Sequence, residues 1–412
     1  MTEQFLPSSN RKDLSDLQRL PRSPVLSYLQ KQAQPKSPRH EAPAPQTTYK
    51  IFPSIGSYSP SNLWAFVSDY FRHRLGRRYP FQTYAAGQAN GGVYTMPADA
   101  EIRIALAGDW ATGTDEAAAI ANLITAFQPH YSIHLGDVYY VGDPVEVGEN
   151  FLGIPNPDNN FTPCRWPSGT EATFALNGNH EMYSLGTAYF TKMLPALGRT
   201  VAGRTDGQFA SFFCLENEFW RLIAVDTGYN SIGMPVVEYF WPPDSSLPDA
   251  LLDWLRHTVK PRSDDPRGII IMSHHQYFSG FEQWYPKPAQ QLAEFFSRPV
   301  LWLWGHEHRF AIYEEAKMEG GVIAYGRCIG HGGMPVDLPR KAPLHEFAVE
   351  FVDERLYPND ENLIVGYNGF AKMTLRDGEL TLDYVDVRGT RVFSETWTVD
   401  QGKLVRLKAR RG

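Results

Sequence analysis

Five short polar clusters interrupt the apolar runs of this chain, and each follows a run that is typical of a buried strand. Every cluster therefore places oxygen or nitrogen donors where a strand ends and a loop begins. Divalent and trivalent metal ions bind carboxylate, amide and imidazole groups that converge from several elements. The pattern therefore predicts a site for two metal ions. In chain order the clusters are Gly108-Asp109, Gly136-Asp137-Val138-Tyr139-Tyr140, Gly178-Asn179-His180-Glu181, Ser273-His274-His275 and Gly305-His306-Glu307-His308.

The first two clusters belong to a predicted strand-helix-strand unit. Residues 102–107 form the apolar run before Asp109, and residues 131–135 form the run before Asp137. In α/β folds, functional side chains gather at the carboxyl ends of the strands, as these two do. The helix between the two runs is indicated by an apolar stripe of Ile120, Leu123, Ile124 and Phe127.

The rest of the chain alternates further strands with helices and then becomes rich in strands. Residues 173–176, 269–272 and 300–304 are the apolar runs before the last three clusters. Two hairpins are predicted, one of them at the Asp377-Gly378 turn. The further predicted elements are a hairpin of 210–215 with 220–225, helices over 248–259 and 288–296, and strands over 369–375, 379–387 and 391–399.

The order of the clusters resembles the calcineurin-like metallophosphoesterase superfamily. Its pattern runs Asp, then Gly-Asp-x-x-Asp or Tyr, then Gly-Asn-His-Asp/Glu, then His, then Gly-His-x-His. All five parts are present between Asp109 and His308. The resemblance covers about residues 100 to 400, and it implies an α/β fold: a four-layer αββα sandwich of two mixed sheets, here with an N-terminal extension.

One departure from the superfamily pattern points to a particular branch. Most members carry a histidine two residues after the first aspartate, where this chain has Ala111. Tyr140 lies three residues after Asp137, the position at which the purple acid phosphatase branch uses a tyrosinate to bind ferric iron. Tyr139 is the neighbouring aromatic residue, and only the three-residue offset selects Tyr140. The resemblance is therefore to the purple acid phosphatase-like branch.

The resemblance implies a ligand set for two metal ions, with Asp137 bridging them. Free tyrosine has a pKa of about 10, so a phenolate ligand needs a strong Lewis acid such as ferric iron. We therefore expect Fe(III) at the tyrosine site and Fe, Mn or Zn at the other. The first ion is assigned Asp109, Tyr140 and His308, and the second is assigned Asn179, His274 and His306.

The same resemblance implies hydrolysis of phosphate monoesters, or of diesters, by in-line attack of a hydroxide that bridges the metals. His180 is expected to contact the phosphate and to donate a proton to the leaving oxygen. Glu181 is expected to orient His180 by a hydrogen bond to one ring nitrogen. The residues predicted to take part in catalysis are therefore His180, Glu181 and Asp137.

Several other polar residues near the clusters have open roles. His275 competes with His274 for one ligand position, and it either contacts substrate or packs. His134 is expected to be a core histidine, and His331 lies in a glycine-rich loop that could approach the pocket but is left out of the predicted site. Asp226 at the end of its strand is expected to form a turn. Trp110 and Tyr183 are further candidates for the wall of the pocket.

Charge and cysteine content limit the possible partners and compartments. The chain has 39 basic and 46 acidic residues and a net charge of −7, which offers no general attraction to nucleic acid. No secretory signal and no apolar run of membrane-spanning length is visible. Three scattered cysteines indicate reduced, structural thiols. We therefore expect a cytoplasmic enzyme that acts on a small phosphate ester and does not bind nucleic acid. The sequence does not specify the oligomeric state.

The composition divides the chain into four parts. Residues 1–48 are rich in Pro, Ser, Gln and charge, which predicts a disordered or draped arm. Residues 49–96 contain an amphipathic helix followed by an arginine cluster, and this helix either packs on the catalytic domain or docks a partner or a membrane surface. Residues 97–402 are predicted to be the catalytic domain, and residues 403–412 a basic tail.

Two other functions are compatible with the sequence. The first is a phosphodiesterase with zinc or manganese at both sites, in which Tyr140 does not bind a metal. The second is a scaffold that kept the fold and lost catalysis, which the missing histidine at Ala111 would favour. Metal analysis together with a visible spectrum distinguishes the iron enzyme from the first of these, and turnover of a generic aryl phosphate excludes the second.

Overall fold

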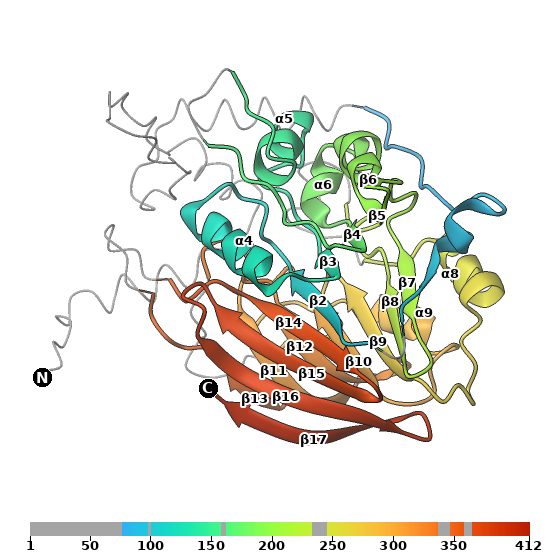
Figure 1. Cartoon of the computed structure of the whole chain (residues 1–412). Helices are drawn as coiled ribbons and strands as arrows, with labels where there is room; N and C mark the ends of the chain where they lie inside the picture. The colour runs from blue at the N-terminus through green and yellow to red at the C-terminus, as the bar shows by residue number, and fades with distance from the viewer. Residues whose placement is uncertain (1–75, 98–99, 158–161, 233–244, 337–346, 358–364) are drawn as a thin grey trace, which may run out of the picture.

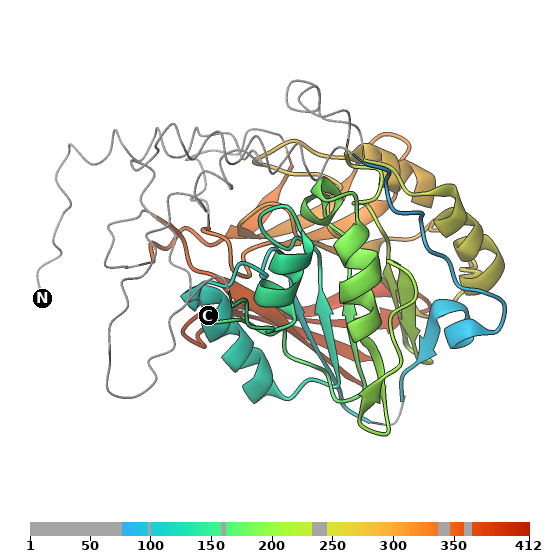
Figure 2. The ribbon, with the colours of Figure 1, turned by 90° about the horizontal axis from the view of Figure 1, so that it is seen from above.

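Two mixed β-sheets face each other at the centre of the structure, and helices cover their outer faces (Figure 1). The computed structural model describes residues 76–97, 100–157, 162–232, 245–336, 347–357 and 365–412. The predicted arm over 1–48 and most of the predicted basic helix lie outside these residues. The αββα layering that the sequence predicted is confirmed, because α4 lies on one side of the two sheets and α8 on the other (Figure 2).

The first sheet has nine strands in the described part of the chain, with a parallel centre and antiparallel flanks. The central strands β2, β3 and β4 run parallel, and β14 joins β2 in antiparallel orientation. The strand order is β17 (Lys403–Arg411), β16 (Arg391–Asp400), β15 (Glu379–Asp386), β14 (Gly369–Arg376), β2 (Ile102–Ala107), β3 (Tyr131–His134), β4 (Ala172–Ala175), β5 (Gly198–Val201) and β6 (Arg204–Thr205).

The second sheet has eight described strands, and its centre is also parallel. Strands β8, β9, β10 and β12 run in the same direction, while β7 pairs with β8 as the predicted hairpin. The strand order is β1 (Val93–Thr95), β7 (Phe213–Glu216), β8 (Trp220–Ala224), β9 (Gly268–Ser273), β10 (Val300–Trp304), β12 (Ile323–Ile329), β11 (Phe310–Lys317) and β13 (Val349–Val352).

Short helices connect the strands. The α-helices are α4 (Asp115–Phe127), α5 (Pro144–Glu146), α6 (Asn179–Tyr183), α8 (Asp249–Trp254) and α9 (Pro286–Leu292). The 3₁₀ segments are Gln88–Gly92 and Leu194–Ala196, and the π segments are Val147–Phe151, Tyr189–Met193 and Leu255–Val259. The helix predicted over 248–259 is therefore present as α8 continued by a π turn.

The hydrophobic core has three layers because the central strands are buried on both faces. Ile104 and Phe174 of the first sheet pack with Ile270 and Leu303 of the second between the sheets. A second layer lies between the eight-stranded sheet and helices α8 and α9, and a third lies under α4. Burial on both faces explains why these strands read as continuous apolar runs in the sequence.

Helix α4 begins and ends where local chemistry dictates. The Thr114 hydroxyl accepts a hydrogen bond from the backbone N–H of Ala117, which satisfies one of the free N–H groups at the helix start. Ile120 and Ile124 are fully buried against the nine-stranded sheet. The helix ends at Gln128, whose backbone is left-handed with φ of 51°. The predicted apolar stripe is therefore the face that packs.

Two predicted boundaries differ from the structure. Residues 403–411 are not a basic tail, since they form β17 and pair with β16 from Asp400 to Phe393. Their charged side chains suit the exposed edge of a sheet, which explains why composition alone was misleading. At the other end, β1 pairs with β7 inside the eight-stranded sheet, so the catalytic fold includes residues before 97.

His134 is a core histidine, as predicted, but it has no hydrogen bonds within the described residues. Its ring is enclosed by Trp110, Phe151 and Trp166. Neither ring nitrogen has a hydrogen-bond partner there. Burial lowers the pKa of His134 to about 3, which keeps the ring neutral.

A fully buried ion pair links the two sheets. Arg327 of β12 donates from Nε and Nη2 to the two carboxylate oxygens of Glu395 in β16, at 2.6 and 2.7 Å. Tyr384 donates a further hydrogen bond to Glu395. Arg327 Nη1 also donates to the backbone oxygens of Tyr313 and Gly326. The two charges therefore satisfy each other inside the core.

Removing one charge of this pair should destabilise the fold strongly. In Glu395→Gln the buried guanidinium loses its counter-charge, so we expect the free energy of unfolding to fall by about 3 to 5 kcal/mol in urea denaturation. The double variant Arg327→Met with Glu395→Leu should recover most of this loss. The matched control is Arg262→Ala, which breaks an exposed pair with Asp264 and should change stability far less. Equal effects of Glu395→Gln and Arg262→Ala would contradict the prediction.

Candidate metal centre

All five polar clusters meet at one end of the two sheets. Parallel strands β2, β3 and β4 deliver Asp109, Asp137 and Asn179, while parallel strands β9 and β10 deliver His274 and the His306 loop. The carboxyl ends of parallel strands meet at the same edge of a sheet. Because the two sheets face each other, the clusters from both sheets converge, as the sequence predicted.

Three of the predicted ligands have a backbone conformation that is unusual for residues with a side chain. Asp109, Asp137 and His306 have φ angles of 58°, 73° and 65°. Such left-handed residues cost on the order of 1 kcal/mol each, so the surrounding contacts must hold them. Hydrogen bonds hold them in place: the Asp109 N–H donates to Gly136 O, and the His306 N–H donates to Asp109 Oδ2 at 2.7 Å.

The glycines that precede the ligands leave room for the carboxylates. A Cβ atom on Gly178 would lie 2.0 Å from Asp137 Oδ1, and one on Gly305 would lie 2.7 Å from Asp109 Oδ2. Both separations are far shorter than van der Waals contact, so any side chain there would displace a ligand. This close approach explains why a glycine recurs beside the metal-binding residues.

The first group of donors consists of Asp109, His308 and a tyrosine. The Tyr139 hydroxyl lies 2.6 Å from Asp109 Oδ1 and 2.8 Å from His308 Nε2. The sequence prediction had chosen Tyr140 for this position. The Tyr139 hydroxyl is the one seen against Asp109 and His308, and the backbone oxygen of Tyr140 contacts His180. Tyr140 as the ligand stays a prediction, and Tyr139 becomes a second candidate for the same position.

The second group consists of Asn179, His274 and His306. His274 Nε2 lies 3.1 Å from Asn179 Oδ1 and 3.2 Å from His306 Nδ1. Two contacts fix these orientations: His274 Nδ1 faces the backbone oxygen of Leu135 at 2.9 Å, and the Asn179 amide donates to the Tyr183 hydroxyl. Such partners on the far side of a ligand are typical of metal-binding histidines and amides. Sequence spacing gave no signal for the Leu135 contact.

Asp137 lies between the two groups of donors. One carboxylate oxygen, Oδ1, is 3.3 Å from His274 Nε2, and the other, Oδ2, is 3.1 Å from the Tyr139 hydroxyl. The backbone N–H of His180 donates to Oδ1 at 3.0 Å. The carboxylate is buried, with Oδ1 toward the second group of donors and Oδ2 toward the first.

These side chains fit two metal ions. With bonds of about 2.1 Å, two ligands on adjacent corners of a tetrahedron or octahedron lie roughly 3.0 to 3.4 Å apart. Asn179 to His274, His274 to His306, His274 to Asp137 and Asp109 to His308 are separated by 3.1, 3.2, 3.3 and 3.4 Å. Within the described residues, Asp109, Asp137 and His274 also form one of the groups whose donor atoms lie close enough to share a cation.

The buried charges strongly influence one another. Burial raises the pKa of Asp109 to about 7, with Asp137 adding to the rise and His274 opposing it. Burial alone would lower the pKa of His274, but the charge of Asp137 raises it to about 9. Burial and the two carboxylates hold the pKa of the Tyr139 hydroxyl well above its usual value. A bound cation would favour the ionised forms of Asp109 and Tyr139.

His180 lies beside the metal-binding groups. Its Nδ1 is 2.6 Å from the backbone oxygen of Tyr140, and its Nε2 is 3.7 Å from Asp137 Oδ2. The ring packs against Tyr139 and Tyr183. One ring nitrogen is therefore anchored, and the other points toward the predicted metal ligands.

Glu181 does not orient His180 as predicted. Its Oε2 accepts hydrogen bonds from the backbone N–H groups of Gly178 and Asp137, at 2.8 and 3.2 Å. These bonds cap the first turn of α6 and tie it to the Asp137 loop. Burial, followed by the charge of Asp137, raises the pKa of Glu181 to about 8. The backbone oxygen of Tyr140 occupies the position beside His180 that the sequence prediction assigned to Glu181.

The remaining polar candidates are divided between the site and its surroundings. His275 lies in a group with His274 and His306, so it belongs to the site. His331 is buried and stacks on Phe310. Asp226 forms the predicted turn, since it accepts hydrogen bonds from the backbone N–H groups of Gly228 and Tyr229. Ala111 lies beside the Asp137 loop, where its backbone oxygen accepts from the N–H of Tyr139.

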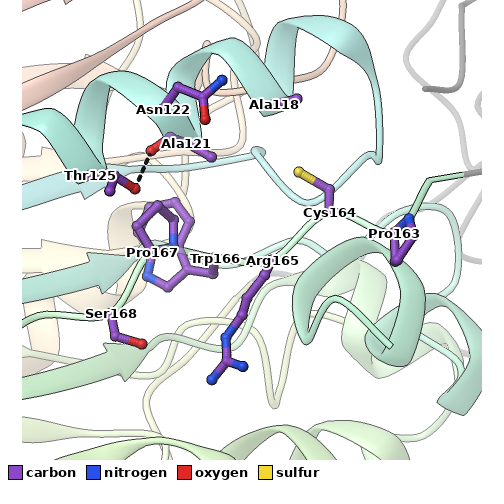
Figure 3. A pocket seen from close by; sticks show the side chains of 10 residues that line it. All are labelled: Ala118, Ala121, Asn122, Thr125, Pro163, Cys164, Arg165, Trp166, Pro167 and Ser168. Carbon is purple, nitrogen blue, oxygen red and sulfur yellow. Dashed lines mark hydrogen bonds between the residues drawn. The ribbon is translucent and has the colours of Figure 1, made fainter. Parts of the chain in front are cut away.

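The structure also has a surface hollow away from the polar clusters. It lies between α4 and residues 163–168 and has a volume of about 260 Å³ (Figure 3). Cys164 is the one thiol among its lining residues, and burial raises the pKa of that thiol to about 12. A protonated thiol is a poor nucleophile, and the volume is below that of a typical small-molecule site.

Several solved structures are distantly similar to this chain. A purple acid phosphatase, PPD1, from seeds of yellow lupin (Lupinus luteus) is 13% identical, with a TM-score of 0.48; the match covers 73% of this chain and 54% of that one. GAP50, described as the anchor in the inner membrane complex of Plasmodium, is 14% identical, with a TM-score of 0.43 and coverage of 73% and 89%. A structure of PhoD is 12% identical, with a TM-score of 0.42 and coverage of 76% and 73%. Similarity at this level carries no argument about activity.

The match to a family model is more informative. No curated protein matches the chain significantly. Among the described residues, no helix has the length and apolar character needed to cross a bilayer. The model of the calcineurin-like phosphoesterases matches residues 102–310, just over half of the 412 residues and all five polar clusters. The predicted superfamily is thereby confirmed: this chain belongs to the calcineurin-like phosphoesterase family and is a metal-dependent phosphoesterase.

Proposed function

We propose that this protein hydrolyses phosphate monoesters at a centre of two metal ions. The observation that carries the proposal is the position of Asp137, whose two oxygens face different groups of donors. A carboxylate in this position can bridge two cations, as in two-metal hydrolases. The proposed ligands are Asp109, Tyr139 and His308 for one ion, Asn179, His274 and His306 for the other, and Asp137 for both.

We assign ferric iron to the group that contains the tyrosine. The Tyr139 hydroxyl is surrounded by Asp109, Asp137 and His308, and its pKa is raised by burial and by the two carboxylates. Only a strong Lewis acid would make the phenolate the stable form in such surroundings. The second group offers two imidazoles and an amide, which suit Fe, Mn or Zn.

The protein side chains position the phosphate and provide a proton. When bound, the two cations would supply positive charge for the phosphoryl oxygens and a water of lowered pKa as nucleophile. His180 has Nδ1 anchored on Tyr140 O, so Nε2 is the atom available to a substrate. We propose that this nitrogen donates a proton to the departing oxygen. Tyr183 holds the Asn179 amide so that its oxygen faces His274.

The proposed activity depends on the second group of ligands. Purified protein supplied with iron, zinc and manganese should hydrolyse p-nitrophenyl phosphate. Asn179→Ala and His306→Ala should each lower kcat/KM by about 100-fold or more, because the loss of a ligand weakens binding of the ion. Elemental analysis should show two ions per chain in the wild type and fewer in each variant. The control is Asn122→Ala, at an exposed position of α4. Two bound ions without turnover of any monoester or diester would instead support a catalytically inactive scaffold.

The identity of the tyrosine ligand has a spectroscopic consequence. A phenolate bound to ferric iron absorbs visible light, so the iron-loaded protein should be coloured. Tyr139→Phe should lose this band, because its hydroxyl is the one that faces Asp109 and His308. Tyr140→Phe is the matched control and should keep the band. A colourless, fully active wild-type protein free of iron would reject the iron assignment and favour zinc or manganese at both sites.

The role of His180 can be tested by varying the leaving group. His180→Gln keeps a polar side chain but removes the proton donor, so hydrolysis of alkyl phosphates should slow by roughly 100-fold or more. Hydrolysis of p-nitrophenyl phosphate should slow much less, because nitrophenolate departs without protonation. Metal content should stay at the wild-type level. The same loss with both substrates would mean that His180 only positions the phosphate.

A further inference from the structure

His275 lies in the metal centre although no motif assigns it a function. It follows His274 at the end of β9, and its side chain is 3% exposed. Its ring is 4.5 Å from the ring of His306 and 4.9 Å from that of His274, measured between centroids. One nitrogen from each of these three histidines lies within 4.8 Å of the other two. The three imidazoles therefore surround one small volume.

The orientation of His275 resembles that of a metal-binding histidine. Its Nδ1 lies 3.1 Å from the Thr227 hydroxyl, which also accepts from the His275 backbone N–H at 2.9 Å. Thr227 is itself tied down, because its backbone oxygen accepts from the Ser245 hydroxyl. With Nδ1 engaged, Nε2 is the nitrogen left for a cation. His274 is built the same way, with Nδ1 against Leu135 O and Nε2 toward the ligands.

The core histidines of this fold have different surroundings. His134 is enclosed by three aromatic rings, and His331 stacks on Phe310. His275 instead packs edge-on against Tyr285 and lies against the rings of His306 and His274. Imidazoles gain little by packing against one another, whereas a shared cation attracts the lone pairs of all three. The surroundings of His275 therefore favour a ligand over a packing role.

We infer that His275 supplies a third imidazole nitrogen to the cation held by Asn179, His274 and His306. This inference rests on the proposed two-metal centre. Three neutral nitrogens suit borderline ions such as Zn²⁺, Co²⁺ or Fe²⁺, whereas Mg²⁺ and Mn²⁺ prefer oxygen ligands. His275 thus makes the second site selective for nitrogen-preferring ions.

The test uses Co²⁺ as the probe and does not depend on turnover. Metal-free protein is titrated with Co²⁺ against a competing chelator, and NMR counts the imidazole N–H signals that the paramagnetic ion shifts. His275→Gln keeps a side chain that can still hydrogen-bond Thr227. We expect this variant to lose one shifted signal and to bind Co²⁺ at the site of Asn179, His274 and His306 at least 10-fold more weakly. It should also prefer Co²⁺ over Mn²⁺ less strongly than the wild type does.

Two controls separate the possible failures. His130→Gln removes an imidazole at the opposite end of β3, where its Nδ1 accepts from the Arg103 N–H, and it should leave signals and affinity unchanged. A circular dichroism melt checks that His275→Gln is folded, and His275→Asn serves as a second variant. Wild-type signals and affinity in both folded His275 variants would overturn the inference. Failure of the wild type itself to bind two Co²⁺ ions would overturn the proposed metal centre instead.

Discussion

The carboxylate of Asp137 is the point at which the two halves of the structure meet. It is buried, and an isolated charge in such surroundings is unstable unless partners compensate it. Those partners come from both sheets: Tyr139 and the His180 backbone follow strands of the first, and His274 follows a strand of the second. The Asp137 charge is therefore compensated only when the strand ends of both sheets converge on it.

The body of the fold meets a similar requirement with protein charges alone. Arg327 and Glu395 lie on strands of opposite sheets, and their hydrogen bonds are bidentate. Both charges are satisfied without any added ion. At the metal centre, by contrast, the contacts of Asp109 and Asp137 come from imidazoles, a phenol and backbone N–H groups, and burial raises the pKa of Asp109 to about 7. The structural ion pair is therefore neutralised within the protein, whereas the two site carboxylates would be neutralised by bound cations.

Much of the fold and of the site could be predicted from the sequence because burial leaves a clear pattern. The continuous apolar runs predicted the parallel strands, and the glycines after them marked the metal-binding loops. Residue spacing does not show which of two adjacent side chains a loop turns inward, so the structure adds Tyr139 as a candidate ligand beside the predicted Tyr140. The role of Glu181 was missed because the backbone groups that it binds have no signature in the sequence.

Composition was misleading where the fold overrides it. Residues 403–411 carry five basic residues and read as a tail, yet they complete a sheet edge, where charged side chains remain in water. The backbone pairing that orders them is invisible in their side chains. For β1, a three-residue strand, the partner β7 lies more than a hundred residues away, and no local signal specifies such pairing.

Asp109, Asp137 and His306 have a strained, left-handed backbone and are also proposed metal ligands. Binding of ions and backbone strain are therefore linked at the same three residues. Without bound ions, the backbone strain at these residues is not offset. With ions bound, the ligand–metal bonds would offset it. Glycine at these three positions would relieve the strain and remove the proposed ligands at the same time. Asp, Asp and His at these positions therefore keep the proposed ligands at a cost in backbone strain.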